Sequence, residues 1–166
     1  MPAGSTNGIA WIAAGTPDPR QPSLLLIHGA GGNSSAWWQQ FAAFAPYRHV
    51  IAYDLAGFGR SASLPMGVDL TVAMVGAALD VLAANGVQRA DVVCQSLGGW
   101  TGLRLALARP DLVNRLILCC TLAGIAHPPG VQAFHQAATR MDARGPAALG
   151  LTPAFEAREP AKALLY

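Results

Sequence analysis

The stretch Asp91-Val92-Val93-Cys94-Gln95-Ser96-Leu97-Gly98-Gly99-Trp100 decides the fold of this chain. Residues 91–94 contain a β-branched run and predict a buried strand. A turn of the pattern small-x-Ser-x-Gly-Gly follows. Residues 97–108 then predict a helix that ends at Arg109-Pro110. A strand that leads into a helix through such a short turn is typical of α/β proteins.

The same alternation continues on both sides of this stretch. Strands are predicted at 9–13, 24–27, 50–53, 91–94 and 116–120, and helices at 35–44, from Asp69 or Thr71 to Asn85, and at 97–108. Strands that alternate with helices imply parallel pairing and right-handed crossovers. We therefore expect an α/β fold with a doubly wound, mostly parallel sheet and flanking helices.

The character of the sequence changes after Gly124. The segment His127-Pro128-Pro129-Gly130 breaks the chain, and residues 131–166 are alanine-rich, helix-prone pieces without a further strand. We expect two parts, with the α/β core at 1–124 and a separate helical segment at 125–166.

Composition limits the possible partners and location. Of 166 residues, 52% are hydrophobic and 12% charged, and the net charge of +2 is too small to indicate nucleic acid or an anionic membrane. No apolar run approaches the roughly 20 residues that span a bilayer, and no signal peptide is evident. Cys94, Cys119 and Cys120 lie in or beside predicted strands, which favours reduced thiols in a cytoplasmic protein. The sequence contains no CxxC pair, so we do not expect a metal site.

Ser96 is the strongest catalytic candidate. A serine on a tight turn between strand and helix is the context of a nucleophile elbow, in which the hydroxyl projects over the end of a sheet. The amide of Leu97 would then point towards the developing oxyanion. The alternative is that Ser96 only caps the 97–108 helix.

Two glycine-rich loops follow earlier strands. In His28-Gly29-Ala30-Gly31, the amide of Ala30 is the predicted second oxyanion donor, with Gly31 next, and His28 is expected to be structural. In the segment from Asp54 to Ser61, Asp54 is a possible catalytic acid, although we favour a role bracing its loop through backbone amides.

A dinucleotide-binding loop is the competing interpretation of Gly29-Ala30-Gly31 and Asp54. The third glycine of that motif would be Ser34, and Ser96 with its two glycines would stay unexplained. We therefore expect no cofactor.

Together these motifs resemble the α/β-hydrolase family, in the branch of esterases, lactonases, epoxide hydrolases and haloperoxidase-like enzymes. The resemblance covers residues 9–124. It implies that Ser96 is the nucleophile, that the amides of Ala30 and Leu97 form the oxyanion hole, and that residues 125–166 begin a helical lid.

The resemblance also implies a catalytic acid and histidine that follow Ser96 in the chain. The strand from Leu116 leads to Cys119-Cys120-Thr121-Leu122, which holds no acid. His127 or His135 could replace the missing base, but exposed or lid-packing histidines are the favoured interpretation. We expect a hydrolase that is inactive or incomplete as 166 residues, with a hydrophobic sheet edge open to self-association.

The expected activity is hydrolysis of an ester, lactone or related acyl bond in a small molecule. Gly31, Gln95 and Trp37 are candidate substrate contacts, although Trp37, like Trp38, Phe58 and Trp100, is favoured as core. The alternatives are an acyltransferase or cofactor-free haloperoxidase on the same scaffold, and a non-catalytic binding module.

Overall fold

A computed structural model describes residues 2–139 and 150–163. The chain divides into two compact units, Met1–Gly124 and Ile125–Tyr166. The division falls at the residue where the composition changes.

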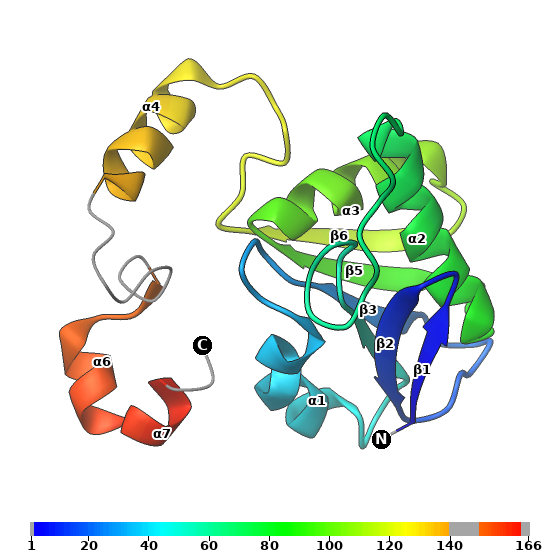
Figure 1. Cartoon of the computed structure of the whole chain (residues 1–166). Helices are drawn as coiled ribbons and strands as arrows, with labels where there is room; N and C mark the ends of the chain where they lie inside the picture. Colours follow the sequence, from blue (N-terminus) through cyan, green and yellow to red (C-terminus); the bar gives the residue numbers. More distant parts are fainter. Residues whose placement is uncertain (1, 140–149, 164–166) are drawn as a thin grey trace. The chain divides into compact units, whose positions relative to one another are not determined.

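A six-stranded sheet forms the centre of the first unit (Figure 1). Its strands are β1 (Ala3–Thr6), β2 (Ile9–Ala14), β3 (Ser23–Ile27), β4 (Val50–Tyr53), β5 (Ala90–Gln95) and β6 (Val113–Cys119). They lie in the order β1-β2-β4-β3-β5-β6. The four neighbouring strands β4, β3, β5 and β6 pair in parallel. The strand β2 pairs antiparallel with both β1 and β4. The expected doubly wound, mostly parallel sheet is confirmed.

Helices cover both faces of this sheet. The short 3-10 turn η1 (Ser34–Trp37) and α1 (Trp38–Phe44) lie on one face, and α2 (Leu70–Ala84) and α3 (Leu97–Ala108) lie on the other. The side chains of β3 alternate between two hydrophobic clusters. Leu25 and Ile27 pack with α2 and α3, whereas Leu24 and Leu26 pack with Trp37 and Phe41. A strand buried on both faces reads as a continuous apolar run, as 24–27 does.

Three local features differ from the sequence prediction. The strand β1 was not predicted, although Asn7-Gly8, with φ of 50° and 79°, is the typical two-residue turn of a hairpin. The strand β6 begins at Val113, three residues before the predicted start. The helix predicted at 35–44 is divided into a 3-10 turn, Ser34–Trp37, and an α-helix, Trp38–Phe44.

The second unit is helical in its described part. It contains α4 (Pro128–Ala138), α6 (Pro153–Arg158) and α7 (Pro160–Ala163). The side chain of His127 caps α4 and that of Thr152 caps α6. These three helices contain no buried residue. No described helix is both long enough and apolar enough to cross a membrane.

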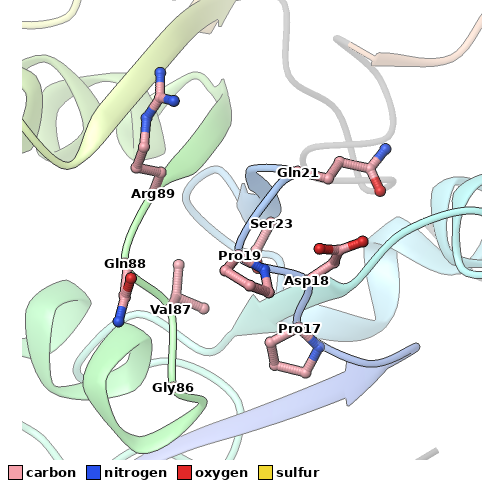
Figure 2. Close-up of a pocket in the computed structure, with 9 residues that line it drawn as sticks. All are labelled: Pro17, Asp18, Pro19, Gln21, Ser23, Gly86, Val87, Gln88 and Arg89. Carbon is pink, nitrogen blue, oxygen red and sulfur yellow. The ribbon is translucent and has the colours of Figure 1, made fainter.

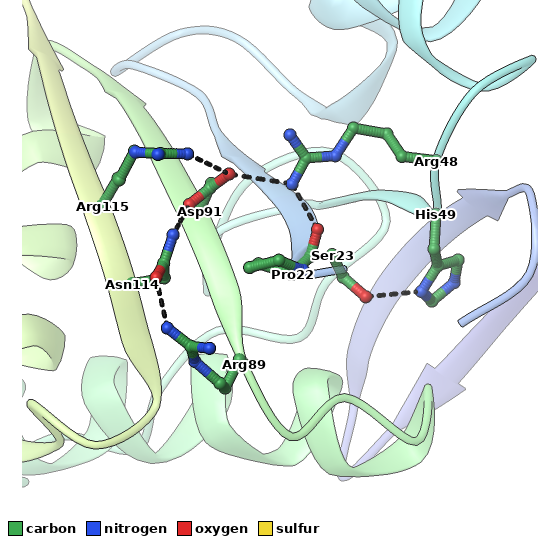
Figure 3. Close-up of polar contacts among 8 residues, drawn as sticks. All are labelled: Pro22, Ser23, Arg48, His49, Arg89, Asp91, Asn114 and Arg115. Carbon is green, nitrogen blue, oxygen red and sulfur yellow. Dashed lines mark hydrogen bonds and ion pairs between the residues drawn. The ribbon is translucent and has the colours of Figure 1, made fainter. Parts of the chain in front are cut away.

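A polar network joins the amino-terminal ends of the strands (Figure 3). The Asp91 carboxylate accepts hydrogen bonds from Arg48 at 2.9 Å and from Asn114 at 2.7 Å, and Arg115 lies 3.8 Å away. Beside it, the buried Ser23 hydroxyl is 3.0 Å from Nδ1 of His49. The network ties β3, β5 and β6 together at their starts.

The same end of the sheet holds a cavity of about 270 Å³ (Figure 2). Its walls are the loop of Pro17 to Gln21 and the segment of Gly86 to Arg89, which precedes β5. Ser23 begins β3, whereas Ser96 follows the carboxyl end of β5. This cavity therefore lies at the opposite end of the strands from the predicted catalytic serine.

Candidate active site

The loops singled out from the sequence meet at one edge of the sheet. His28 follows β3, Asp54 follows β4 and Ser96 follows β5. Because these strands are parallel neighbours, their carboxyl ends lie side by side. In open α/β sheets, ligands bind at this edge.

Ser96 sits on a strained turn between β5 and α3. Its φ of 48° and ψ of −115° are unfavourable for a residue with a Cβ, and such strain costs on the order of 1–3 kcal/mol. Its backbone N–H donates to the carbonyl of Cys119 at 3.0 Å, but its side chain does not cap the helix. The helix-cap alternative is therefore wrong, and the backbone has the geometry of a nucleophile elbow.

Small residues let the elbow pack closely. A Cβ added to Gly98 would lie 2.5 Å from the carbonyl oxygen of Ile27, so α3 can start this close to β3 only with glycine there. A Cβ on Gly102 would collide with the sulfur of Cys94. The buried Cys94 thiol therefore occupies the space that Gly102 leaves open.

The loop after β3 contacts Ser96. A Cβ added to Gly29 would lie 3.0 Å from the Cβ of Ser96. The backbone amide of Ala30, next in the chain, and that of Leu97, the first helical residue, donate no hydrogen bond to any described group. Two unpaired N–H groups near a serine are donors that could form an oxyanion hole. Their role, and that of Gly31, stays a prediction.

His28 is a structural residue in this arrangement. Its ring is fully buried, Nδ1 lies 2.7 Å from the carbonyl oxygen of Gly29, and Nε2 accepts the N–H of Leu55 at 2.9 Å. Both bonds form only in the neutral ring with the proton on Nδ1. Burial lowers the pKa of His28, which favours this neutral form. The ring joins the loops after β3 and β4 and has no free nitrogen for a general base.

Asp54 braces the same two loops. One carboxylate oxygen accepts the N–H of Ser34 at 2.7 Å, and the other accepts the N–H of Arg60 at 2.8 Å. Burial tends to raise the pKa of Asp54, but the hydrogen bonds from Ser34 and Arg60 outweigh it and the net shift is downward. Asp54 is thus a buried carboxylate bound to backbone amides, as favoured from the sequence.

The candidate substrate contacts divide into two groups. Gln95 is half-buried, and its Oε1 lies 3.6 Å from the position of a Cβ on Gly29, near the elbow. Trp37 is 9% exposed and packs with Leu24, Leu26 and Phe41 under the sheet. This packing agrees with the favoured interpretation of Trp37 as a core residue, and a contact with substrate stays a prediction.

The other predicted aromatics have different neighbours. The ring of Phe58 stands edge-on to His28, with centroids 5.7 Å apart. Trp100 supports the guanidinium of Arg104, which lies 3.8 Å from the ring centroid. Trp38 is 39% exposed on α1.

The remaining histidines belong to two other parts of the structure. His49 is bound to Ser23 at the opposite ends of the strands. His127 and His135 belong to the second unit, where they line one groove together with Val131. Nδ1 of His127 accepts the N–H of Gly130. A role for either as base stays a prediction.

Sequence reasoning missed the residues that support the Ser96 backbone. They are the carbonyl of Cys119 and the side chain of Thr121, at the end of β6. The role predicted for residues 119–122 was limited to a catalytic acid, which this segment does not contain. The signal available in the sequence was Thr121, a hydroxyl residue two positions after the end of β6, the strand that pairs with β5.

Comparison with known proteins identifies the family. Residues 22–158 match the sequence profile of the α/β-hydrolase fold. The chain belongs to the α/β-hydrolase fold family. The esterase, lactonase and epoxide-hydrolase resemblance seen in the motifs is thereby confirmed at the level of the family.

Curated members of the family are similar over the first unit. Proteins named "Putative carbamate hydrolase RutD" share 38% identity with the chain over 104 residues in Yersinia enterocolitica and 34% over 119 residues in Caulobacter segnis. These matches cover 62% and 71% of the chain, but 37% and 45% of the relatives. The chain therefore matches less than half the length of these two α/β-hydrolase relatives.

Solved α/β-hydrolase structures superpose on most of the chain. An enol-lactonase from Burkholderia xenovorans is 26% identical with a TM-score of 0.70, covering 99% of this chain and 65% of its own. A thermophilic esterase from Thermogutta terrifontis has a TM-score of 0.71 at 24% identity, covering 95% and 59%. The second likeness supports the fold alone.

Proposed function

We propose that this chain carries the nucleophile and oxyanion hole of a serine hydrolase that cleaves an acyl bond. The observation that carries the proposal is the backbone of Ser96, which is strained, uncapped and directly followed by α3. A serine hydroxyl held this way has no described role in stabilising the helix. Membership of the α/β-hydrolase fold family supports hydrolysis as the use of the Ser96 hydroxyl.

The substrate class follows from what the relatives share. Their names include a carbamate hydrolase and an enol-lactonase, and both substrates contain a carbonyl carbon bonded to a leaving oxygen or nitrogen. Attack on such a carbon produces a tetrahedral oxyanion. We propose an ester, lactone or carbamate of a small molecule as the substrate of the whole protein.

In the proposed reaction, the Ser96 oxygen bonds to the carbonyl carbon while its proton passes to a general base. The amides of Ala30 and Leu97 would bind the oxyanion. The carbon–leaving-group bond then breaks, the base returns the proton to the leaving group, and an acyl-serine remains. Water hydrolyses this ester by the same steps and restores the hydroxyl.

The general base is the open part of the proposal. His28 and His49 have partners that exclude them. We propose His127, His135 or a group outside the described residues as the base. Each histidine can be tested by substitution with glutamine.

A fluorophosphonate probe tests the proposal, because it reacts covalently only with an activated serine. The sequence alone predicts an inactive or incomplete chain, so labelling of the 166 residues requires that they supply a base themselves. We propose that they do, and we expect labelling of the chain, loss of labelling in Ser96→Ala, and retention in Ser23→Ala. Ser23 is the matched control because its hydroxyl is already paired with a histidine, at 3.0 Å.

Absence of labelling in a folded chain would contradict an activated Ser96 and favour the non-catalytic binding module. Labelling that is lost in Ser23→Ala but kept in Ser96→Ala would move the nucleophile to the opposite end of the sheet. Circular dichroism establishes that each variant is folded.

A further inference from the structure

The hydroxyl of Thr121 is bound to the backbone of Ser96. Thr121 follows β6, and its Oγ1 donates to the carbonyl oxygen of Ser96 at 2.5 Å. The N–H of Ser96 donates to the carbonyl of Cys119 at 3.0 Å. The carbonyl of Ser96 also accepts the N–H of Gly99 in α3 at 3.0 Å. Each backbone polar group of the strained residue thus has a partner at the end of one neighbouring strand, and the carbonyl has a second partner in the helix. We propose that Thr121 is a positioning residue that keeps Ser96 in its elbow conformation.

The hydroxyl proton of Thr121 is directed by a second contact. The N–H of Ala123 donates to the same Oγ1 at 2.9 Å. A hydroxyl that accepts there has its one proton available for another partner, and Ser96 O lies within reach. The contacts therefore assign the direction of the bond as Thr121 to Ser96.

The backbone around Thr121 is shaped to make this contact. Cys120 and Ala123 both have left-handed φ, 49° and 51°, although neither is glycine. Strain of this kind persists only where surrounding contacts impose it. Arg104, which stacks on Trp100, donates to the carbonyl of Ala123 at 3.1 Å and supplies one such contact.

The second glycine of the elbow motif makes room for Thr121. A Cβ on Gly99 would lie 2.5 Å from Oγ1 of Thr121 and would collide with its methyl group. Gly98 serves the approach of α3 to β3, so the two adjacent glycines have different functions. The motif is thus adapted to a side chain on another strand.

The catalytic consequence rests on the proposed function. If Ser96 is the nucleophile, its backbone conformation sets the direction of the hydroxyl, and small misplacements of a reacting group cost large factors in rate. Thr121 would act through Ser96 and touch no substrate.

The test compares three substitutions in the full chain. Thr121→Val removes the hydroxyl at nearly constant shape, and Thr121→Ser restores it. Thr101→Val is the control for the loss of a threonine hydroxyl, because Thr101 is fully buried in α3 and its hydroxyl has no partner in the described structure, whereas Thr121 is half-buried. For fluorophosphonate labelling we expect Thr121→Val to lower the maximal rate by at least about tenfold without weakening probe binding. Thr121→Ser and Thr101→Val should stay close to the wild type.

Amide hydrogen exchange gives a readout that does not need an active serine. The Ser96 N–H stays bonded to the carbonyl of Cys119 in Thr121→Val, but the variant loses the bond to the Ser96 carbonyl. The less restrained turn should open more often, so exchange of the Ser96 amide should speed up by about fivefold or more in Thr121→Val, but not in Thr101→Val. Amide exchange tests the positioning role of Thr121 even if the wild type is not labelled. Absence of labelling would count against the proposed function alone. If Thr121→Val does not fold, Thr121→Cys, a weaker donor, should show intermediate exchange. Unchanged exchange and labelling in the folded variants would overturn the proposal.

Discussion

At the scale of single residues, burial decides which titratable groups can do chemistry. His28 and Asp54 belong to motifs that suggest catalysis, yet each is buried and has its polar atoms bound by loop backbone. The sequence supported both alternatives for Asp54, because a brace and a catalytic acid require the same residue type. The partners that distinguish them are 20 and 6 residues away.

The buried histidines make stability depend on pH. Burial lowers the pKa of His28 and of His49 below 6.5, so the unfolded chain binds more protons than the folded one when the pH falls through that value. The free energy of unfolding should therefore decrease from pH 7 to pH 5, by at most about 1.4 kcal/mol per pH unit for each histidine. Urea denaturation at several pH values measures this. His28→Gln should reduce the slope, and a stability that rises on acidification would contradict the argument.

The cysteines should differ in reactivity. Burial raises the pKa of the Cys94 thiol to about 12, whereas Cys120 is exposed. Because the thiolate is the reactive form, a thiol reagent should modify Cys120 in the native protein and reach Cys94 only after unfolding. Mass spectrometry of the labelled peptides, with Cys120→Ser as control, measures this. Rapid native labelling at Cys94 would show that its site opens.

At the scale of elements, short-range signals determine the parts that the sequence predicts well. The bounds of β4 and α3 are as predicted, because a wholly apolar run and a turn-to-proline interval mark their ends. Thr121 could not be assigned in this way. Its contact with Ser96 depends on the left-handed backbone at Cys120 and Ala123. Neither position holds glycine or asparagine, the residues from which a left-handed backbone is usually predicted.

The start of α2 gives a prediction at this scale. Asp69 Oδ1 accepts the N–H groups of Thr71 and Val72 at 2.7 and 3.1 Å. Replacing such a cap with alanine costs about 1 kcal/mol, so Asp69→Ala should lower the free energy of unfolding by about that amount. Asp69→Asn retains an acceptor and should be close to the wild type. Equal losses in both variants would assign the effect to charge instead of capping.

At the scale of the whole molecule, the sheet has an apolar outer strand. In the described structure β6 ends the sheet, and its Ile117 and Leu118 are 49% and 39% exposed. Exposed apolar edges favour pairing with another chain. We expect concentration-dependent self-association in sedimentation velocity, reduced by Ile117→Lys. Val72→Lys, at an exposed apolar position on α2, should leave it unchanged, and a monomer at all concentrations would contradict the expectation.

The support of Ser96 by its neighbours also bears on how such a protein could diverge. The contacts that impose the turn use the backbone of Ser96, and none of them uses its hydroxyl. A descendant with alanine at this position would keep the shape of the loops at negligible cost to folding. If Ser96 is the nucleophile, one mutational step would therefore remove the proposed chemistry and leave a scaffold that could survive as a binding protein. The reverse step would restore the nucleophile on a turn that is already built.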